Sequence, residues 1–160
     1  MKHLALILSI SLLLAAVAGA TPVLFLVRHA EKASSNGNDP DLSVAGRKRA
    51  EALARILKDA QITSVFVTEF KRTQETAEPT AGEANVNPTV VPANDISGLV
   101  AKLRAASGNA LVVGHGNTIP ELVKALGITR PVSIPEADYT EIFVVSVGDE
   151  PQVVQLHYPF

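Results

Sequence analysis

Four short apolar runs, separated by segments of helical period, are the feature that most limits the fold of this chain. Each run is continuous rather than alternating, which is typical of strands buried on both faces of a parallel sheet. In the intervening segments, apolar residues recur at i, i+3, i+4 and i+7, so each segment can lay one apolar stripe on the sheet. The runs cover residues 23–27, 65–67, 90–91 and 110–113, and the stripes are Leu53, Ile56, Leu57 and Ala60, then Ile96, Leu99, Val100 and Leu103, then Ile119, Leu122, Val123 and Leu126.

The C-terminal part changes period. Residues 139–147 and 153–157 are typical of two strands, and the Gly-Asp-Glu-Pro segment at 148–151 between them is typical of a turn. Thr118 and Glu121 have the spacing of a capping box at the start of the last helix, and Gly127 suits its end. These patterns predict an α/β fold: a three-layer α/β/α sandwich with a mostly parallel sheet and a C-terminal antiparallel edge hairpin.

The first twenty residues have the three parts of a secretory signal. A short basic start is followed by an apolar stretch over residues 4–18 and by the small residues Ala18, Gly19 and Ala20. The stretch is shorter than the roughly 20 apolar residues that a membrane-spanning helix needs, which favours cleavage after Ala20 over a retained anchor. We therefore expect a signal peptide at 1–20, a single domain at 21–160, a periplasmic or secreted location, and no stable membrane insertion after cleavage.

Charge and cysteine content exclude several classes of function. The formal net charge of -2 and the lack of a Lys/Arg run argue against nucleic acid as a partner. Because the chain has no cysteine, it can form neither a disulfide nor a lipid-modified cysteine, and thiol catalysis is excluded.

Polar residues able to do chemistry follow each of the four apolar runs, and the carboxyl ends of parallel strands meet at one edge of a sheet. Arginine offers donors matched to phosphate oxygens, and neutral histidine is a nucleophile near physiological pH. Nearby arginines oppose protonation of His29 and so keep a lone pair available. This set suits phosphoryl transfer, which needs positioning and charge stabilisation. The residues are Arg28 and His29, Lys71 and Arg72, Asp95, and Gly114 and His115.

Lys71 and Arg72 fall in or near the first turn of a helix if that helix opens just after Thr68. The helix macrodipole disfavours cations there by a few tenths to about 1 kcal/mol, and a bound anion would remove the conflict. The alternative is that one or both side chains simply point to solvent.

Four segments resemble the motifs of the histidine phosphatase superfamily, branch 1, which contains phosphoglycerate mutases, fructose-2,6-bisphosphatase and small phosphohistidine phosphatases. Residues 26–31 are similar to its Arg-His-Gly/Ala signature, and Leu42-Ser43-x-x-Gly46 to the opening of its first helix. Residues 68–77 resemble its second arginine motif, and residues 113–118 its second histidine motif. The resemblance runs from about residue 23 to residue 147 in the family's order, and it implies a phosphoglycerate mutase-like fold.

The resemblance implies a role for each matching residue. His29 would attack phosphorus and become a phosphohistidine, while Arg28, Arg72 and His115 would bind the phosphoryl group and neutralise its oxygens. Water would then hydrolyse the phosphoenzyme. The family needs no metal, in keeping with the lack of a short-spaced ligand motif such as His-x-x-x-His, and we expect no cofactor in this chain.

A general acid must protonate the leaving oxygen, and three carboxyl groups are candidates. Asp95 falls after the third strand, where the family often places the acid, but helix N-capping explains it equally well. Glu121 is explained by the capping box, and Glu31 is expected to shape the pocket. His157 lies in the terminal hairpin and is expected at the surface.

The sequence thus predicts a metal-independent phosphatase acting on a small phosphorylated substrate, a phosphomonoester or a related phosphoryl compound. A phosphoglycerate mutase-type transfer and a non-catalytic anion-binding envelope protein on the same scaffold are the alternatives. Specificity is expected in residues 33–41, 82–95 and 130–138, which carry no recognisable code for the substrate, and oligomeric state cannot be inferred.

Overall fold

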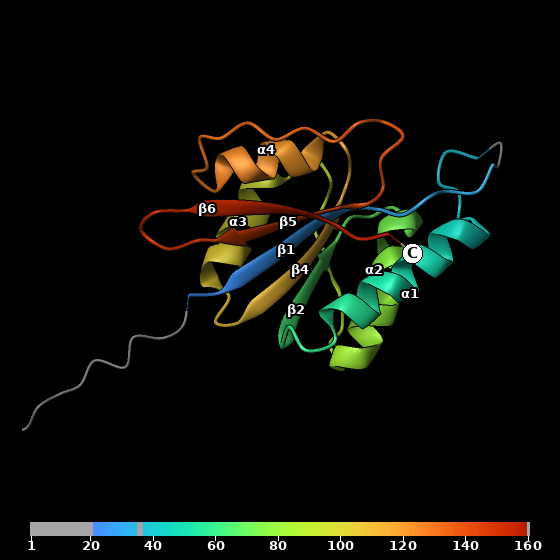
Figure 1. Ribbon diagram of the computed structural model, residues 1–160, viewed down its shortest axis with the longest axis horizontal. Coiled ribbons are helices and arrows are strands. Elements are labelled where there is room, and N and C mark those ends of the chain that lie inside the picture. Colours follow the sequence, from blue (N-terminus) through green and yellow to red (C-terminus); the bar gives the residue numbers. More distant parts are fainter. Residues whose placement is uncertain (1–20, 35–36, 160) are drawn as a thin grey trace, which may run out of the picture.

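The continuous apolar runs form the centre of a mixed six-stranded sheet in the computed structural model, which describes residues 21–34 and 37–159 (Figure 1). The strand order is β3-β2-β4-β1-β5-β6. Strands β1 to β4 pair in parallel, whereas β5 pairs antiparallel with β1 and with β6. The strands are β1 Val23–Arg28, β2 Ile62–Val67, β3 Thr89–Val90, β4 Asn109–Gly114, β5 Glu141–Ser146 and β6 Gln152–His157.

Two helices cover each face of the sheet, which gives the predicted three layers (Figure 1). Helices α1 (Val44–Leu57) and α2 (Lys71–Ala84) lie on one face, and α3 (Ile96–Ala105) and α4 (Thr118–Ala125) lie on the other. The α/β prediction with a C-terminal antiparallel hairpin is therefore confirmed.

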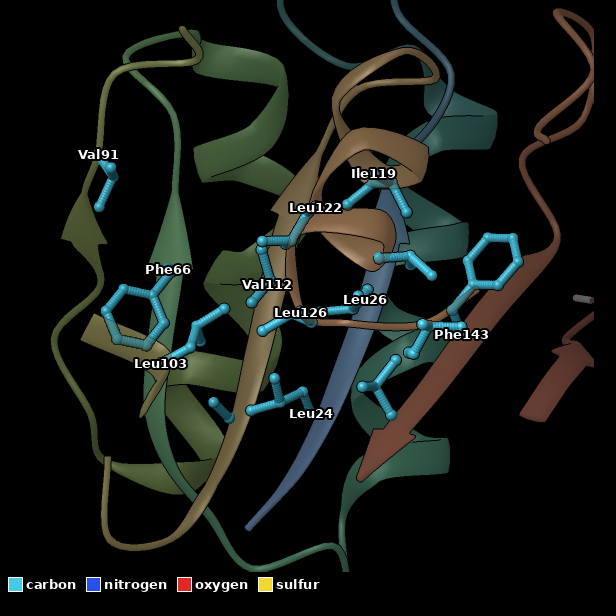
Figure 2. Close-up of a cluster of buried hydrophobic side chains, with 14 residues drawn as sticks. Leu24, Leu26, Phe66, Val91, Leu103, Val112, Ile119, Leu122, Leu126 and Phe143 are labelled. Atoms are coloured by element: carbon cyan, nitrogen blue, oxygen red, sulfur yellow. The ribbon is translucent and has the colours of Figure 1, made fainter. Parts of the chain in front are cut away.

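Residues that alternate along the central strands are buried in two separate cores. In β1, Leu24 and Leu26 face α3 and α4, whereas Val27 faces α1 and α2. All three are fully buried, as expected for strands that lack a solvent-facing side. Figure 2 shows the first of these cores, in which Leu103 of α3 and Ile119 of α4 pack against the sheet.

The stripes predicted for α3 and α4 are confirmed, but the one predicted for α1 is partly wrong. Leu53 and Leu57 are buried, yet Ile56 is 51% exposed and α1 ends before Ala60. The buried face of α1 instead consists largely of alanines, together with Arg49. Because α1 packs closely against α2, mostly small side chains fit between the two helices. The third run is also shorter than the others: β3 lies at the edge of the sheet, and its Val90 is exposed.

The helix boundaries follow local capping. Ser43 caps α1 by accepting a hydrogen bond from the Gly46 amide at 3.0 Å, and a Cβ at Gly46 would collide with the Glu31 carbonyl oxygen. Gly127 has a φ of 97°, in the left-handed region, and terminates α4 as predicted.

The predicted signal peptide lies outside the described residues. Within residues 21–34 and 37–159, no helix combines the length and apolar character that crossing a bilayer requires.

Candidate active site

The register of two parallel strands places both motif histidines at the same sheet edge. Arg28 of β1 is opposite Gly114 of β4, and the His29 amide donates to the Gly114 carbonyl at 2.9 Å. Each histidine therefore follows directly on a strand end. The His29 and His115 rings meet edge to face, with centroids 5.4 Å apart.

His29 presents a defined nitrogen to the site. Its Nδ1 lies 2.8 Å from the Ala30 carbonyl oxygen, and because that oxygen can only accept, Nδ1 carries the proton. The lone pair of the neutral ring is therefore on Nε2. Burial lowers the pKa of His29 to about 4, and the charges of Arg72 and Arg28 add to this effect against the raising influence of the Ala30 bond.

His115 is held by a threonine pair. Its Nε2 lies 3.1 Å from Thr68 Oγ1, which in turn lies 3.0 Å from Thr73 Oγ1. Thr73 donates to the Phe70 carbonyl at 2.8 Å, so the pair is fixed to the start of α2. Burial and, to a lesser extent, the charge of Arg72 lower the pKa of His115 to about 4. Both histidines are thus neutral at physiological pH.

Arg28 links β1 to the segment before β5. Its Nη1 donates to the carbonyl oxygens of Pro135, Glu136 and Asp138 at 3.2, 2.6 and 3.2 Å. The guanidinium carbon lies 4.3 Å from the Tyr139 ring centroid. The Nε–H is buried and has no hydrogen-bond partner among the described residues. A buried donor of this kind is costly unless an acceptor such as an oxyanion reaches it.

Arg72 lies in the first turn of α2, as predicted. Its guanidinium carbon is 4.3 Å from the centroid of the Phe70 ring, and the same ring meets His115 edge to face at 5.3 Å. The carboxylate of Asp39 accepts from the Lys71 amide at 3.0 Å and lies 3.7 Å from Arg72. The anion that the sequence led us to expect at this helix N-terminus is therefore partly supplied by the protein itself.

These groups line an open pocket of about 800 Å³. It brings together four of the five predicted site residues with side chains from the α2, β3–α3, β4–α4 and α4–β5 segments. The lining residues are Arg28, His29, Phe70, Arg72, Ala93, Asn94, Ile96, His115, Gly116, Asn117, Thr118, Glu121, Ile134 and Glu136.

The fifth predicted residue, Asp95, does not line this pocket. Its carboxylate caps α3 by accepting from the Gly98 amide at 2.9 Å and from the Ser97 hydroxyl at 3.2 Å. The N-cap interpretation of Asp95 is confirmed, and its placement offers nothing to a leaving group in the pocket. Its neighbour Asn94 faces the pocket instead.

The capping box predicted for Thr118 and Glu121 is wrong. Asn117 is the N-cap of α4 and makes no side-chain capping bond, while the Thr118 hydroxyl accepts from the His115 amide at 2.9 Å. Thr118 thus shapes the histidine turn rather than the helix start. Because the box does not form, Glu121 loses its structural explanation, and it lines the pocket together with Glu136.

Glu31 supports the site from outside the pocket. Both of its carboxylate oxygens accept from Arg49, at distances between 2.7 and 3.0 Å. Burial opposes ionisation of Glu31, but the hydrogen bonds from Arg49 hold its pKa below the usual value. Glu31 is therefore an ion-paired carboxylate that ties the loop after β1 to α1.

Sequence reasoning missed the side chains that hold the motif residues in place. Thr68 and Phe70 lie inside the second arginine motif, but nothing in the sequence indicated that both would contact His115. Glu136 lies in the 130–138 segment, where specificity was expected without a recognisable code, and Tyr139 directly follows that segment.

A sequence profile of the histidine phosphatase superfamily (branch 1) matches residues 24–95, which contain Arg28, His29 and Arg72. In this segment, which is a little under half of the chain, the sequence is similar to the histidine phosphatase superfamily. The matched segment ends before His115, and the fold places the ring of that residue beside the ring of His29. No curated protein matches the chain in sequence.

Solved structures share the fold of this chain over most of their length. The protein histidine phosphatase SixA in complex with tungstate is 23% identical, with a TM-score of 0.70 over 84% of this chain and 96% of that one. The mycobacterial glucosyl-3-phosphoglycerate phosphatase in complex with inorganic phosphate is 18% identical, with a TM-score of 0.69 over 86% and 97% of the two chains. A protein described as mycobacterial hydrolase 2 is 15% identical, with a TM-score of 0.66 over 83% and 89%.

Proposed function

We propose that this protein is a phosphatase that hydrolyses a small phosphomonoester, or a related phosphoryl compound, through a phosphohistidine at Nε2 of His29. The observation that carries the proposal is a neutral, oriented imidazole in the same pocket as Arg28, whose buried Nε–H has no hydrogen-bond partner in the part of the chain that the structure describes. A nucleophile and an unfilled donor for an oxyanion thus share one pocket with Arg72 and His115.

In the first step, the Nε2 lone pair attacks phosphorus, the N–P bond forms and the bond from phosphorus to the leaving oxygen breaks. Arg28 and Arg72 neutralise the phosphoryl oxygens, and a protonated carboxyl group gives its proton to the leaving oxygen. In the second step, the same group, now a carboxylate, takes a proton from water. The hydroxide attacks phosphorus and the N–P bond breaks. Inorganic phosphate leaves the pocket, and neutral His29 is regenerated.

We assign the proton transfer to Glu121. Of the carboxyl groups among the described residues, Glu121 and Glu136 line the pocket, whereas Asp95 is used in the α3 cap and Glu31 pairs with Arg49. Glu121 lies on α4, one turn beyond the His115 motif, and a helix holds a catalytic group more precisely than a loop does. Glu136 is the competing candidate.

The test is hydrolysis of p-nitrophenyl phosphate by purified protein in the presence of EDTA. We expect wild-type protein to turn over and His29→Ala to lose activity by at least a thousandfold. Labelled phosphate trapped on the wild-type enzyme should be acid-labile and base-stable, as a phosphohistidine is. Full activity in His29→Ala would refute the nucleophile assignment, and phosphate binding without turnover across a panel of phosphometabolites would favour a non-catalytic anion-binding protein.

A further inference from the structure

A second cluster of polar side chains comes from the β5–β6 hairpin and the segment before it, and none of its members lines the phosphoryl pocket. Glu141 of β5 is directly opposite His157 of β6, and Asp138 lies three residues before Glu141. One carboxylate oxygen of each acid and one ring nitrogen of His157 all lie within 4.8 Å of one another. The backbone register brings these ligand types together, so no short-spaced sequence motif announces them.

The buried carboxylate of Glu141 is the unusual member of this cluster. Glu141 is only 6% exposed, and its Oε1 accepts from the Gln155 side-chain amide at 2.7 Å. Its Oε2 is buried and has no hydrogen-bond partner among the described residues. A buried carboxylate oxygen without a donor is costly, and the nearby carboxylate of Asp138 makes the cost larger. A cation bound between Asp138 and Glu141 would give the Glu141 oxygen a partner and would neutralise the repulsion between the two carboxylates.

The other two side chains are held in position by Thr140. The Thr140 amide and hydroxyl both donate to Asp138 Oδ1 at 2.7 Å. Because the hydroxyl proton is used in that bond, His157 Nδ1 must donate to Thr140 Oγ1, at 3.0 Å. This arrangement leaves the lone pair of a neutral His157 ring on Nε2. Hydrogen bonds that fix the tautomer and orientation of a ligand are typical of metal sites.

We propose that Asp138, Glu141 and His157 form a binding site for one divalent transition-metal ion of the zinc class. One imidazole and two carboxylates suit Zn²⁺, with water completing the coordination, whereas Ca²⁺ prefers six to eight oxygen ligands. The proposal does not depend on the proposed phosphatase activity, because neither His29 nor the pocket arginines belong to the site.

Binding there would join two segments of the chain. Asp138 belongs to the segment whose carbonyl oxygens accept from Arg28, and His157 belongs to the edge strand β6. An ion between them would tie the wall of the phosphoryl pocket to the hairpin. We therefore expect the site to stabilise the fold without taking part in hydrolysis.

The test is a titration of chelator-treated, dialysed protein with ZnCl₂ by isothermal titration calorimetry, with Co²⁺ absorption as a spectroscopic check. We expect one equivalent to bind, the melting temperature to rise, and Glu141→Gln or His157→Gln to weaken binding at least tenfold. Asp149→Asn, an exposed carboxyl in the turn of the same hairpin, should bind as wild type does. Ca²⁺ should bind at least tenfold more weakly than Zn²⁺.

The decisive comparison is with His29→Ala. If Zn²⁺ binding survives in His157→Gln and disappears in His29→Ala, the ion binds between the pocket histidines and the proposal is overturned. Absence of binding at 100 µM Zn²⁺ would also overturn it. His157 is exposed, so its variant is expected to fold, and circular dichroism together with p-nitrophenyl phosphate hydrolysis in EDTA would verify this.

Discussion

Lowering the pH from 7 to 5 is expected to destabilise this fold, because His29 and His115 are buried in their neutral form. Their pKa values are about 4 in the folded protein, against 6.5 for an ordinary histidine. Between pH 6.5 and pH 4 the unfolded state therefore binds more protons than the folded state. Stability contributed by these groups is complete above pH 6.5 and is lost as the pH falls through this window.

The size of the loss follows from the two pKa values. At pH 5 an unfolded histidine is almost fully protonated and a folded one almost fully neutral, which costs about 2 kcal/mol for each residue, at about 1.4 kcal/mol per unit of pKa. The two histidines together cost about 4 kcal/mol, a large part of the 5–15 kcal/mol typical of a domain. Removing one of them should halve the loss.

The assay is urea unfolding at pH 7 and pH 5 in phosphate-free buffer, since a bound anion would itself stabilise the folded state. We expect the free energy of unfolding to fall by about 4 kcal/mol in the wild type and by about 2 kcal/mol in His115→Gln. Phe70→Leu alters the same ring contact but removes no titratable group, so it should keep the wild-type loss. Equal losses in His115→Gln and the wild type would refute the reasoning.

Two further predictions concern carboxyl groups. Glu121→Gln should slow hydrolysis of an alkyl phosphate by about 10²–10⁴-fold but hydrolysis of p-nitrophenyl phosphate by much less, because only the poorer leaving group needs the proton. An equal effect on both esters would contradict the assignment, and so would the same pattern in Glu136→Gln instead. Glu31→Gln should lower the free energy of unfolding by about 2–4 kcal/mol, because it removes the carboxylate that accepts hydrogen bonds from the largely buried Arg49. Asp41→Asn, in the exposed pair with Lys71, should cost at most about 1 kcal/mol. Urea denaturation distinguishes the two variants, and equal costs would show that burial of the ion pair does not matter.

The sequence predicted the sheet and the ligand edge because both depend on strong local patterns. Strands buried on two faces leave continuous apolar runs, and the carboxyl ends of parallel strands must share an edge. His29 and His115 could therefore be brought together before any coordinates were known. Arg28 ends β1 and Arg72 lies in the first turn of α2. Both arginines therefore lie at the same sheet edge and were predicted together with the histidines.

The carboxyl groups could not be ranked in this way, because side chains compete for nearby backbone donors. Asp95 and Glu121 each had a capping explanation, and only the structure shows that Asp95 caps α3 while Thr118 bonds to the His115 amide. Contacts between distant segments were equally hidden. Nothing in the period of residues 130–141 announces that their carbonyl oxygens would accept from Arg28.

The parallel pairing of β1 with β4 also has a consequence for how this protein acquires activity. The two histidines lie far apart in the sequence, and the His29 amide donates to the Gly114 carbonyl. Pairing of strands so distant in sequence is a slow, non-local step of folding. Phosphate release should therefore lag behind the appearance of helical signal during refolding, so catalysis would report on the closing of the sheet.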